Sequence, residues 1–464
     1  MKLRYNRVSA RLFAAVSFGA LAVSAAPAFA QASSDDAEAE DNIIVVTGIT
    51  KQDANIQDVP TTITFFSGAN LEEKGIQLVG DVATFTPGFN IRGAGNNPTA
   101  LVLSMRGQVQ NDVIATLEPS VGVYLDEMYI ARAYGLNTEM LDISNVQVLK
   151  GPQGTLFGRN TSAGAVLIQT NDPKFGEISG LVKGTYGRFN ERSGTAILNL
   201  GFNDSIAVRG AITYGKRDGY KTDVNTGKKY EGRETLNGRV KVAFKPTDTL
   251  EILLSGEWYD GDIVGPARQN LYYNLGGTGF DPGAADRAAM GGDPDLVAIS
   301  DPSVSPGAPA EGLFNSVKTQ TYMAKVSLET GFGEIRWING YRKITSSNLI
   351  DLDGESSATG NHFTQGTQDL KQYSSELQLT GQGLNDALDY AVGITYFNES
   401  GFDQSRSVTS GGAVWSGFKG IIDNDSMGMY AQANYHFNDA LSFTGGLRYS
   451  IDDKGITAQS AVIP

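Results

Sequence analysis

Cysteine is absent from the 464 residues, which excludes disulfides, cysteine-ligated zinc and thiol catalysis but does not itself fix the compartment. Histidine is almost absent as well, and His362 and His436 lie far apart in the sequence. We therefore expect no iron ligated by the protein itself and no resident cofactor. No GxSxG, HExxH or similar spacing brings a nucleophile and a base together, so we do not expect an enzyme.

An excess of basic charge is also missing. The formal net charge is −14, which argues against nucleic acid as a partner, because phosphate binding needs a basic surface. Glycine is abundant at 56 residues, and there are 19 tyrosines and 21 phenylalanines. This mixture is typical of many strands joined by turns, with aromatic side chains at an interface.

Beyond the N-terminus, no hydrophobic run is long enough for a transmembrane helix. Residues 1–30 contain a basic start, the apolar run LFAAVSFGALAVSAA and the small-residue site Ala28-Phe29-Ala30. This order predicts a cleaved secretory signal peptide; an N-terminal membrane anchor is the alternative.

Residues 31–57 begin with the acidic stretch QASSDDAEAEDN, which predicts a flexible tether. The β-branched run IIVVTG follows directly and is too short to be a stable strand alone. We expect it to join a sheet by strand addition; alternatively it is simply the first strand of the next domain. Its residues are Ile43, Ile44, Val45, Val46, Thr47 and Gly48.

Residues 58–173 predict a compact α+β domain. Apolar segments bounded by turn residues indicate the strands TTITFFSG, VLSMRGQ, SVGVYLDEMYI, SNVQVLKG and AVLIQTND. NLEEKG and LVGDVATF indicate short helices, the second of which ends at Pro87-Gly88.

Residues 174–464 alternate strictly between apolar and polar positions, segment after segment. In ETLNGRVKVAFK, for example, Leu236, Val240 and Phe244 oppose Arg239 and Lys241. The segments run about ten residues, the length that a tilted strand needs to cross a bilayer, and short connections alternate with long ones. The pattern predicts about eleven strands of a transmembrane antiparallel β-barrel; a soluble β-sandwich is the alternative.

The stretch VLKGPQGTLFGRNTSAGAV has the glycines of a phosphate-binding loop but not their spacing. Gly151, Gly154, Gly158 and Gly164 never precede Lys-Ser or Lys-Thr, and AVLIQT reads as a strand. We expect these glycines to serve tight turns and close backbone approach instead of a nucleotide.

Several of these motifs are similar to those of TonB-dependent outer-membrane receptors of Gram-negative bacteria. IIVVTG resembles the family's TonB box, while NIQDVPTTITFFSG, LSMRG and VQVLKGPQGTLFGRNTSAGAVLIQT resemble its plug domain. SSELQL and GLRYSIDDK resemble its barrel strands. Gln147 and Lys150 depart from the acidic residue and the arginine that are common in relatives.

The resemblance implies a plug inside a 22-stranded barrel, surrounded by outer-membrane lipid and lipopolysaccharide. About half of those strands are present, so we expect the sequence to be C-terminally truncated. The implied function is energised import of a scarce, large solute, most often a ferric siderophore, with the TonB, ExbB and ExbD complex as partner. Import of cobalamin, haem or an oligosaccharide, and a passive porin-like channel, are the alternatives.

The resemblance also implies functional residues. Arg106 and Lys150, with Arg159, are expected to hold the plug against the barrel wall, where Glu376 is the candidate partner. Candidates for substrate contact on the outer plug loops are Asn96, Asn97, Gln110, Asn111 and Arg132. DLDGESS (351–357) could bind calcium, but an acidic surface loop is the simpler interpretation, because its glycine comes too early for an EF-hand.

Overall fold

The computed structural model describes residues 45–46, 54–55, 61–94, 97–265, 289–290, 293, 295–297, 313–351, 362–409, 415–438 and 441–463. The chain divides into two units, Met1–Ile43 and Ile44–Pro464. The predicted signal peptide and acidic stretch fall in the first unit, outside the described residues. No helix among the described residues is both long and apolar enough to span a membrane.

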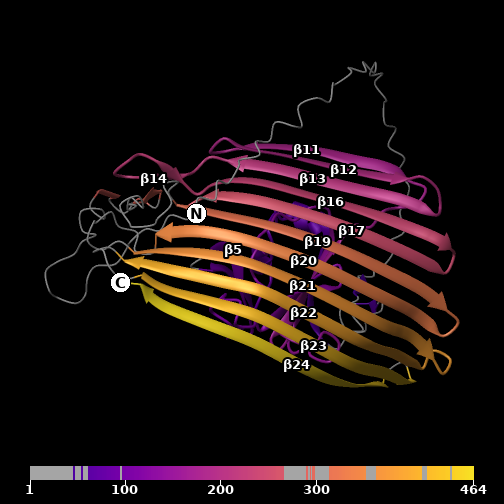
Figure 1. Cartoon of the computed structure of the whole chain (residues 1–464). Helices are drawn as coiled ribbons and strands as arrows, with labels where there is room; N and C mark the ends of the chain where they lie inside the picture. The colour runs from indigo at the N-terminus through magenta and orange to yellow at the C-terminus, as the bar shows by residue number, and fades with distance from the viewer. Residues whose placement is uncertain are drawn as a thin grey trace, which may run out of the picture. The chain divides into compact units, whose positions relative to one another are not determined.

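One large antiparallel sheet, which we call the wall, dominates the second unit (Figure 1). Its 11 strands lie in chain order, which confirms the fold class expected from the alternation. The strands are β11 (Ile178–Gly187), β12 (Glu191–Gly201), β13 (Ile206–Arg217), β16 (Gly232–Thr247), β17 (Leu250–Val264), β19 (Phe314–Thr330), β20 (Gly333–Asp351), β21 (His362–Gly383), β22 (Leu388–Thr409), β23 (Trp415–Asn438) and β24 (Leu441–Ile463).

Most strands are longer than the ten residues expected from the pattern, with lengths from 10 residues in β11 to 24 in β23. The expectation was wrong because it counted only the stretch in which apolar residues alternate. β21, for example, continues beyond that stretch through HFTQGTQD, where the backbone ladder with its neighbours persists without an apolar face.

The wall has an apolar outer face and a polar inner face. In β16, Leu236, Val240 and Phe244 are exposed, whereas Arg239 and Lys241 are buried. A soluble sheet would bury the apolar face instead. The inverted arrangement fits a strand whose outer side meets lipid and whose inner side meets other protein groups.

Aromatic side chains line part of the outer face. Trp258, Tyr322, Tyr341, Tyr373 and Tyr396 are all exposed and lie on five neighbouring strands, β17 to β22. Tyr341 is the register partner of both Tyr322 and Tyr373, and the indole N–H of Trp258 donates to the hydroxyl of Tyr322 at 2.9 Å. Such aromatic bands mark the membrane–water boundary in outer-membrane strands.

The two ends of the wall differ in the length of their connections. The short-turn end has links such as 202–205 between β12 and β13 and 248–249 between β16 and β17. The loop end carries the longer links, including 265–313, part of which forms β18 (Leu296–Val297). β18 pairs with β14 (Lys221–Asp223), which also pairs with β15 (Lys229–Tyr230).

The domain that we call the plug contains a five-stranded sheet in the order β3-β9-β10-β7-β8. Its strands are β3 (Thr62–Ser67), β7 (Val121–Leu125), β8 (Met128–Ile130), β9 (Ile143–Lys150) and β10 (Gly164–Thr170). The helix α1 (Gly68–Glu73), the 3-10 helix η2 (Val79–Phe85) and the small sheet of β4 (Phe89–Ala94), β5 (Asn97–Met105) and β6 (Gln108–Val109) complete it. In Figure 1, β5 is seen behind the wall strands.

The segment SVGVYLDEMYI is a hairpin and not the single strand expected. Leu125 pairs with Met128, and the turn residues Asp126 and Glu127 have φ angles of 47° and 73°. Positive φ at both positions is the geometry of a two-residue hairpin turn, which normally selects Asn-Gly or Asp-Gly. Asp-Glu lacks that signal, so the sequence pattern predicted one continuous strand across the turn.

Gly164 opens β10 beside β9, and it explains one glycine of the stretch VLKGPQGTLFGRNTSAGAV. Its φ is 156°, and a Cβ at this position would overlap the carbonyl oxygen of Leu149 and the sulfur of Met105. The backbone oxygen cannot move without disturbing the sheet. Close backbone approach, and not a phosphate, therefore requires this glycine.

We expect Gly164→Ala to lower the free energy of unfolding by about 3 kcal/mol, because a backbone atom would have to shift. The measurement is denaturant unfolding of the purified protein in detergent micelles. Gly93→Ala is the matched control in the same domain, since a Cβ there meets nothing within 4 Å. Equal stability of the two variants would contradict the steric explanation.

Candidate functional site: the plug–wall interface

The plug is joined to the inner face of the wall by buried ion pairs. Arg132 of the plug donates to both carboxylate oxygens of Glu399 in β22, with two N–O distances of 2.6 Å. The two side chains are 6% and 2% exposed. Burial lowers the pKa of the Arg132 guanidinium, but the hydrogen bonds and charge of Glu399 more than offset this and raise it overall. Both groups are therefore charged. Arg132 also donates to the carbonyl of Leu117 in the plug, and Glu399 also accepts from Asn424 of the wall, but the paired hydrogen bonds between the two side chains join the two domains.

Nearer the short-turn end the charges are reversed, with cations on the wall and carboxylates on the plug. Arg209 in β13 donates to both oxygens of Asp142 at 2.6 and 2.7 Å. Lys241 in β16, almost fully buried, lies 3.0 Å from Asp126 and 2.7 Å from Asp172. Burial would raise the pKa of Asp126, but Lys241 and other nearby groups outweigh it and lower the pKa.

Three of the plug carboxylates stand on left-handed backbone. Asp126, Glu127 and Asp142 all have positive φ, a conformation that costs an L-residue roughly 1–2 kcal/mol. Glu127 lies 3.5 Å from Lys325 and 3.4 Å from Arg336. Strain of this kind persists where surrounding contacts over-determine the geometry, and here those contacts include cations of the wall and hydrogen bonds from Thr170 and Asn171 of the plug.

The interface also holds an apolar cluster. Ala100, Val102 and Ala115 of the plug pack with wall residues that include Ile344 and Ile422. Two smaller apolar clusters also cross the interface, one around Phe397 and one around Leu156, and hydrogen bonds lie between them, such as that from Asn97 to the hydroxyl of Ser346 at 3.1 Å. The interface is thus a mixture of separate apolar clusters and polar contacts.

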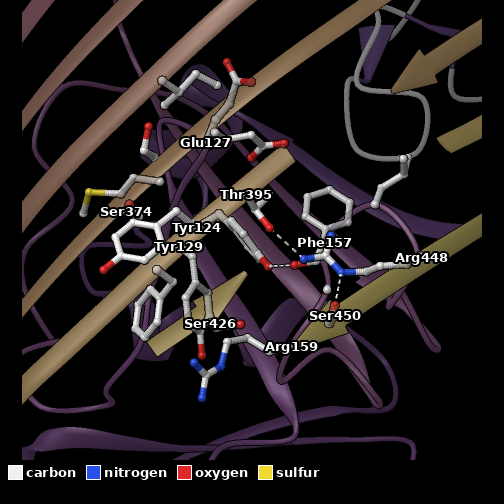
Figure 2. A pocket seen from close by; sticks show the side chains of 18 of the residues that line it. Tyr124, Glu127, Tyr129, Phe157, Arg159, Ser374, Thr395, Ser426, Arg448 and Ser450 are labelled. Carbon is white, nitrogen blue, oxygen red and sulfur yellow. Dashed lines mark hydrogen bonds between the residues drawn. The ribbon is translucent and has the colours of Figure 1, made fainter. Parts of the chain in front are cut away.

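Elsewhere, cavities lie between the described residues of the plug and those of the wall. One, of about 350 Å³, lies against β20 to β24 and is lined by aromatic rings and by Arg448. Figure 2 shows the guanidinium of Arg448 between Thr395 and Ser450, to each of which it donates at 2.9 Å. Another, of about 380 Å³, faces β17 and β19. Glu127 lines both. Space beside charged groups allows water to replace direct contacts.

The residues expected to latch the plug lie differently from that expectation. Glu376 accepts a hydrogen bond at 2.6 Å from Tyr430 of the wall itself, and Arg106 donates to Thr62 within the plug. Burial and the nearby charge of Arg106 lower the pKa of Lys150. Among the described ion pairs, none joins Arg106 or Lys150 to Glu376. Arg159 does reach the wall, because its guanidinium lies 4.9 Å from the ring centroid of Phe397.

The substrate-contact candidates separate into two groups. Asn97 and Arg132 are buried, and their side chains are engaged by the wall, so the structure gives them interface roles. Asn111 is exposed and accepts a hydrogen bond from Arg92 at 3.2 Å, while Gln110 is half-buried. Ligand contact stays a prediction for both. Asn96 lies outside the described residues, as does the DLDGESS stretch after its first residue.

Of the IIVVTG stretch, the structure describes only β1 (Val45–Val46). It pairs with β2 (Ala54–Asn55) in a separate two-stranded sheet, with Val45 opposite Asn55. Its role as a TonB box stays a prediction.

The sequence interpretation missed most interface carboxylates, namely Asp126, Glu127, Asp142, Asp172, Glu399 and Asp403. One signal could have found the wall members: a charged residue at an inward position of an alternating strand needs a partner inside. Glu399 occupies such a position in β22. No group of three or more metal-ligating side chains occurs in the part of the chain that the structure describes.

We expect Glu399→Leu to destabilise the protein by about 3–5 kcal/mol, because it leaves Arg132 charged, buried and unpaired. The double variant Arg132→Met/Glu399→Leu should recover much of this loss, since both charges are then gone. Urea unfolding in micelles measures the cycle, and Lys318→Ala, which breaks an exposed ion pair, should cost about 1 kcal/mol or less. If the destabilisation of the double variant equalled the sum of those of Arg132→Met and Glu399→Leu alone, the two residues would not be coupled.

Two family models match the sequence. The TonB-dependent receptor plug domain matches residues 55–165, and the TonB-dependent receptor-like β-barrel matches residues 257–462. Both domains are those of receptors and not of enzymes.

Curated relatives are similar at low identity. The pesticin receptor of Yersinia pestis is 24% identical over 230 residues, which are 48% of this chain and 32% of the relative. The ferrioxamine B receptor of Salmonella typhimurium (strain SL1344) is 25% identical over 205 residues, which are 41% of this chain and 27% of the relative. The alignments thus span about a third of these receptors or less.

Solved structures share the fold. The ferric yersiniabactin uptake receptor of Yersinia pestis superposes with a TM-score of 0.66 at 18% identity, over 87% of this chain and 61% of that one. The ferripyoverdine receptor of Pseudomonas aeruginosa gives a TM-score of 0.66 at 15% identity, over 91% and 56% of the two chains. With a plug, an inverted strand wall and both family models in chain order, the chain belongs to the TonB-dependent receptors, which are outer-membrane proteins of Gram-negative bacteria.

Proposed function

We propose that the protein takes part in energised import of a scarce, large solute across the outer membrane, and that this solute is a ferric chelate of the siderophore kind. The observation that carries the proposal is the plug–wall interface, where buried ion pairs hold a separate domain against the inner face of the wall. A passive channel would need no such domain.

Ion pairs suit a plug that must be held firmly and yet be displaced. A buried pair is costly to break when one partner leaves without compensation, but water can replace the partner where it has access. The two cavities beside Glu127 supply that access. Displacement therefore needs work, and the plug can return afterwards because the same pairs form again.

The source of that work is proposed to be the TonB, ExbB and ExbD complex, reached through Ile43–Gly48. A short extended segment binds a partner by adding a strand to its sheet, and backbone hydrogen bonds dominate this mode of recognition. The ferric chelate is supported by the relatives, which include a ferrioxamine B receptor and a ferric yersiniabactin uptake receptor.

We expect Val45→Pro to abolish uptake, because proline removes a backbone donor from the added strand, whereas Val45→Ile should be nearly silent. The measurement is accumulation of radio-iron from ferrioxamine B and from ferric citrate in cells that lack their own receptors for these chelates. Asn55→Pro is the matched control, since it disturbs the β1–β2 ladder opposite Val45 without altering the proposed TonB box.

Three outcomes would count against the proposal. Equal loss in Val45→Pro and Val45→Ile would exclude backbone recognition, and equal loss in Asn55→Pro would assign the effect to the β1–β2 ladder. Uptake that persists after the proton-motive force is collapsed would favour the passive channel.

A further inference from the structure

Residues 110–119, which lie between β6 and β7, face the loop end of the wall, and we call them the outer plug loop. Its tip is open to solvent, because Asn111 and Asp112 are exposed. Its middle is not, because Ala115 is fully buried. The loop has no strand or helix of its own, so contacts with other elements must hold its backbone in place.

Asp403 of β22 provides the central contact. Its Oδ2 accepts a hydrogen bond from the backbone N–H of Ala115 at 2.8 Å and another from the hydroxyl of Tyr134 at 2.7 Å. Its Oδ1 accepts from the side-chain amide of Gln368 at 2.9 Å. The same tyrosine hydroxyl also lies against the carbonyl of Val113. The Asp403 carboxylate of β22 thus links the loop backbone, Tyr134 of the plug and the neighbouring wall strand β21.

The environment of Asp403 makes the loop and the carboxylate depend on each other. The residue is 3% exposed, and the donors described around it are all neutral. A buried carboxylate without a cation needs every hydrogen bond that it can accept. If the loop left the wall, Asp403 would lose the hydrogen bond from the N–H of Ala115. The described donors that remain to this carboxylate are the side chains of Tyr134 and Gln368.

Further contacts dock the same loop on the wall, among them the ion pair of Glu118 with Lys454 of β24 at 2.9 Å. The carbonyl of Leu117 accepts a hydrogen bond from Arg132 at 2.6 Å, and Arg132 is held by Glu399, four residues before Asp403 on the inner face of β22. Thr116 packs over Gly420 of β23, where a Cβ would lie 2.7 Å from its methyl group.

We propose that Asp403 is a positioning residue, which fixes the outer plug loop on the wall and so presets the surface that Gln110 and Asn111 offer to a ligand. The role in ligand binding rests on the import function proposed above, whereas the role in holding the loop does not. Asp403 itself is buried and touches no ligand. It would act on affinity by reducing the number of loop conformations that binding must select from.

The test is amide hydrogen exchange of the purified full chain in detergent micelles. Asp403→Leu removes all three hydrogen bonds, and Asp403→Asn keeps the shape but replaces one acceptor with a donor, so it should restore part of the protection. We expect exchange in residues 113–117 to accelerate about tenfold in Asp403→Leu, the equivalent of one lost buried hydrogen bond to a charged group. Residues 146–150 and 164–168 of the plug sheet should keep their protection.

Asp389→Asn is the matched control, because Asp389 lies on the same strand and pairs with His436 of the wall, not with the plug. It should leave loop exchange unchanged. If amide exchange also accelerates in the plug sheet of Asp403→Leu, that variant is misfolded. The exchange of residues 113–117 in Asp403→Asn then tests the proposal instead. Unchanged exchange of residues 113–117 in a folded Asp403 variant would overturn the proposal.

Binding of ferrioxamine B and of ferric citrate, measured on the same samples, tests the ligand role. The relevant chelate is one that the unaltered chain binds. We expect its affinity to fall about tenfold in Asp403→Leu, because binding must then order the loop that Asp403 no longer holds. The affinity should stay constant in Asp389→Asn. A freed loop with unchanged affinity would overturn the ligand role. If the unaltered chain binds neither chelate, the import proposal is weakened for these solutes, while the exchange result still decides whether Asp403 holds the loop.

Discussion

The pairing of buried charge across the plug–wall interface is the constraint on which the rest of the structure depends. A strand wall that turns its apolar face outward must turn its polar face inward, and charges there are tolerated only when partners satisfy them. Arg209, Lys241 and Glu399 are such charges, and each finds its partner in the plug. The plug therefore does more than fill space, because it neutralises the inner face of the wall.

The direction of the pairing changes along the wall. Toward the short-turn end the plug supplies carboxylates, several of them on left-handed turns, and toward the loop end the wall supplies Glu399 and Asp403. Strained turns hold a carboxylate at one spot more precisely than a flexible loop could. At the loop end Glu399 holds the side chain of Arg132, and Asp403 holds plug backbone through the N–H of Ala115. Side chains thus fix the plug at both ends, and main-chain hydrogen bonding is added at the loop end.

Much of the fold follows from local rules that the sequence displays. The period of two in segments such as ETLNGRVKVAFK identifies both the strands and their faces, because neighbouring residues of a strand point to opposite sides. The Asp126–Glu127 turn escaped because its residues carry no turn signal. The ion pairs were not predicted for a different reason. Arg132 and Glu399 are 267 residues apart in the sequence, and no local pattern indicates which inward charge pairs with which plug residue. The resemblance implied a contact between the plug and the wall but chose Glu376, which accepts a hydrogen bond from Tyr430 of the wall itself.

The period of two also ties the lipid bilayer to the plug. Tyr341 belongs to the outer aromatic row, and the next residue, Arg342, points inward and donates to the carbonyl of Gly135 in the plug at 3.3 Å. A strand that slides to keep its aromatic side chains at the membrane boundary must carry its inward groups with it. Bilayer thickness shifts such boundaries at modest energetic cost. A change in thickness would therefore alter the contacts between the inward groups of the wall and the plug. Thinner and thicker membranes would hold the same plug with different strength.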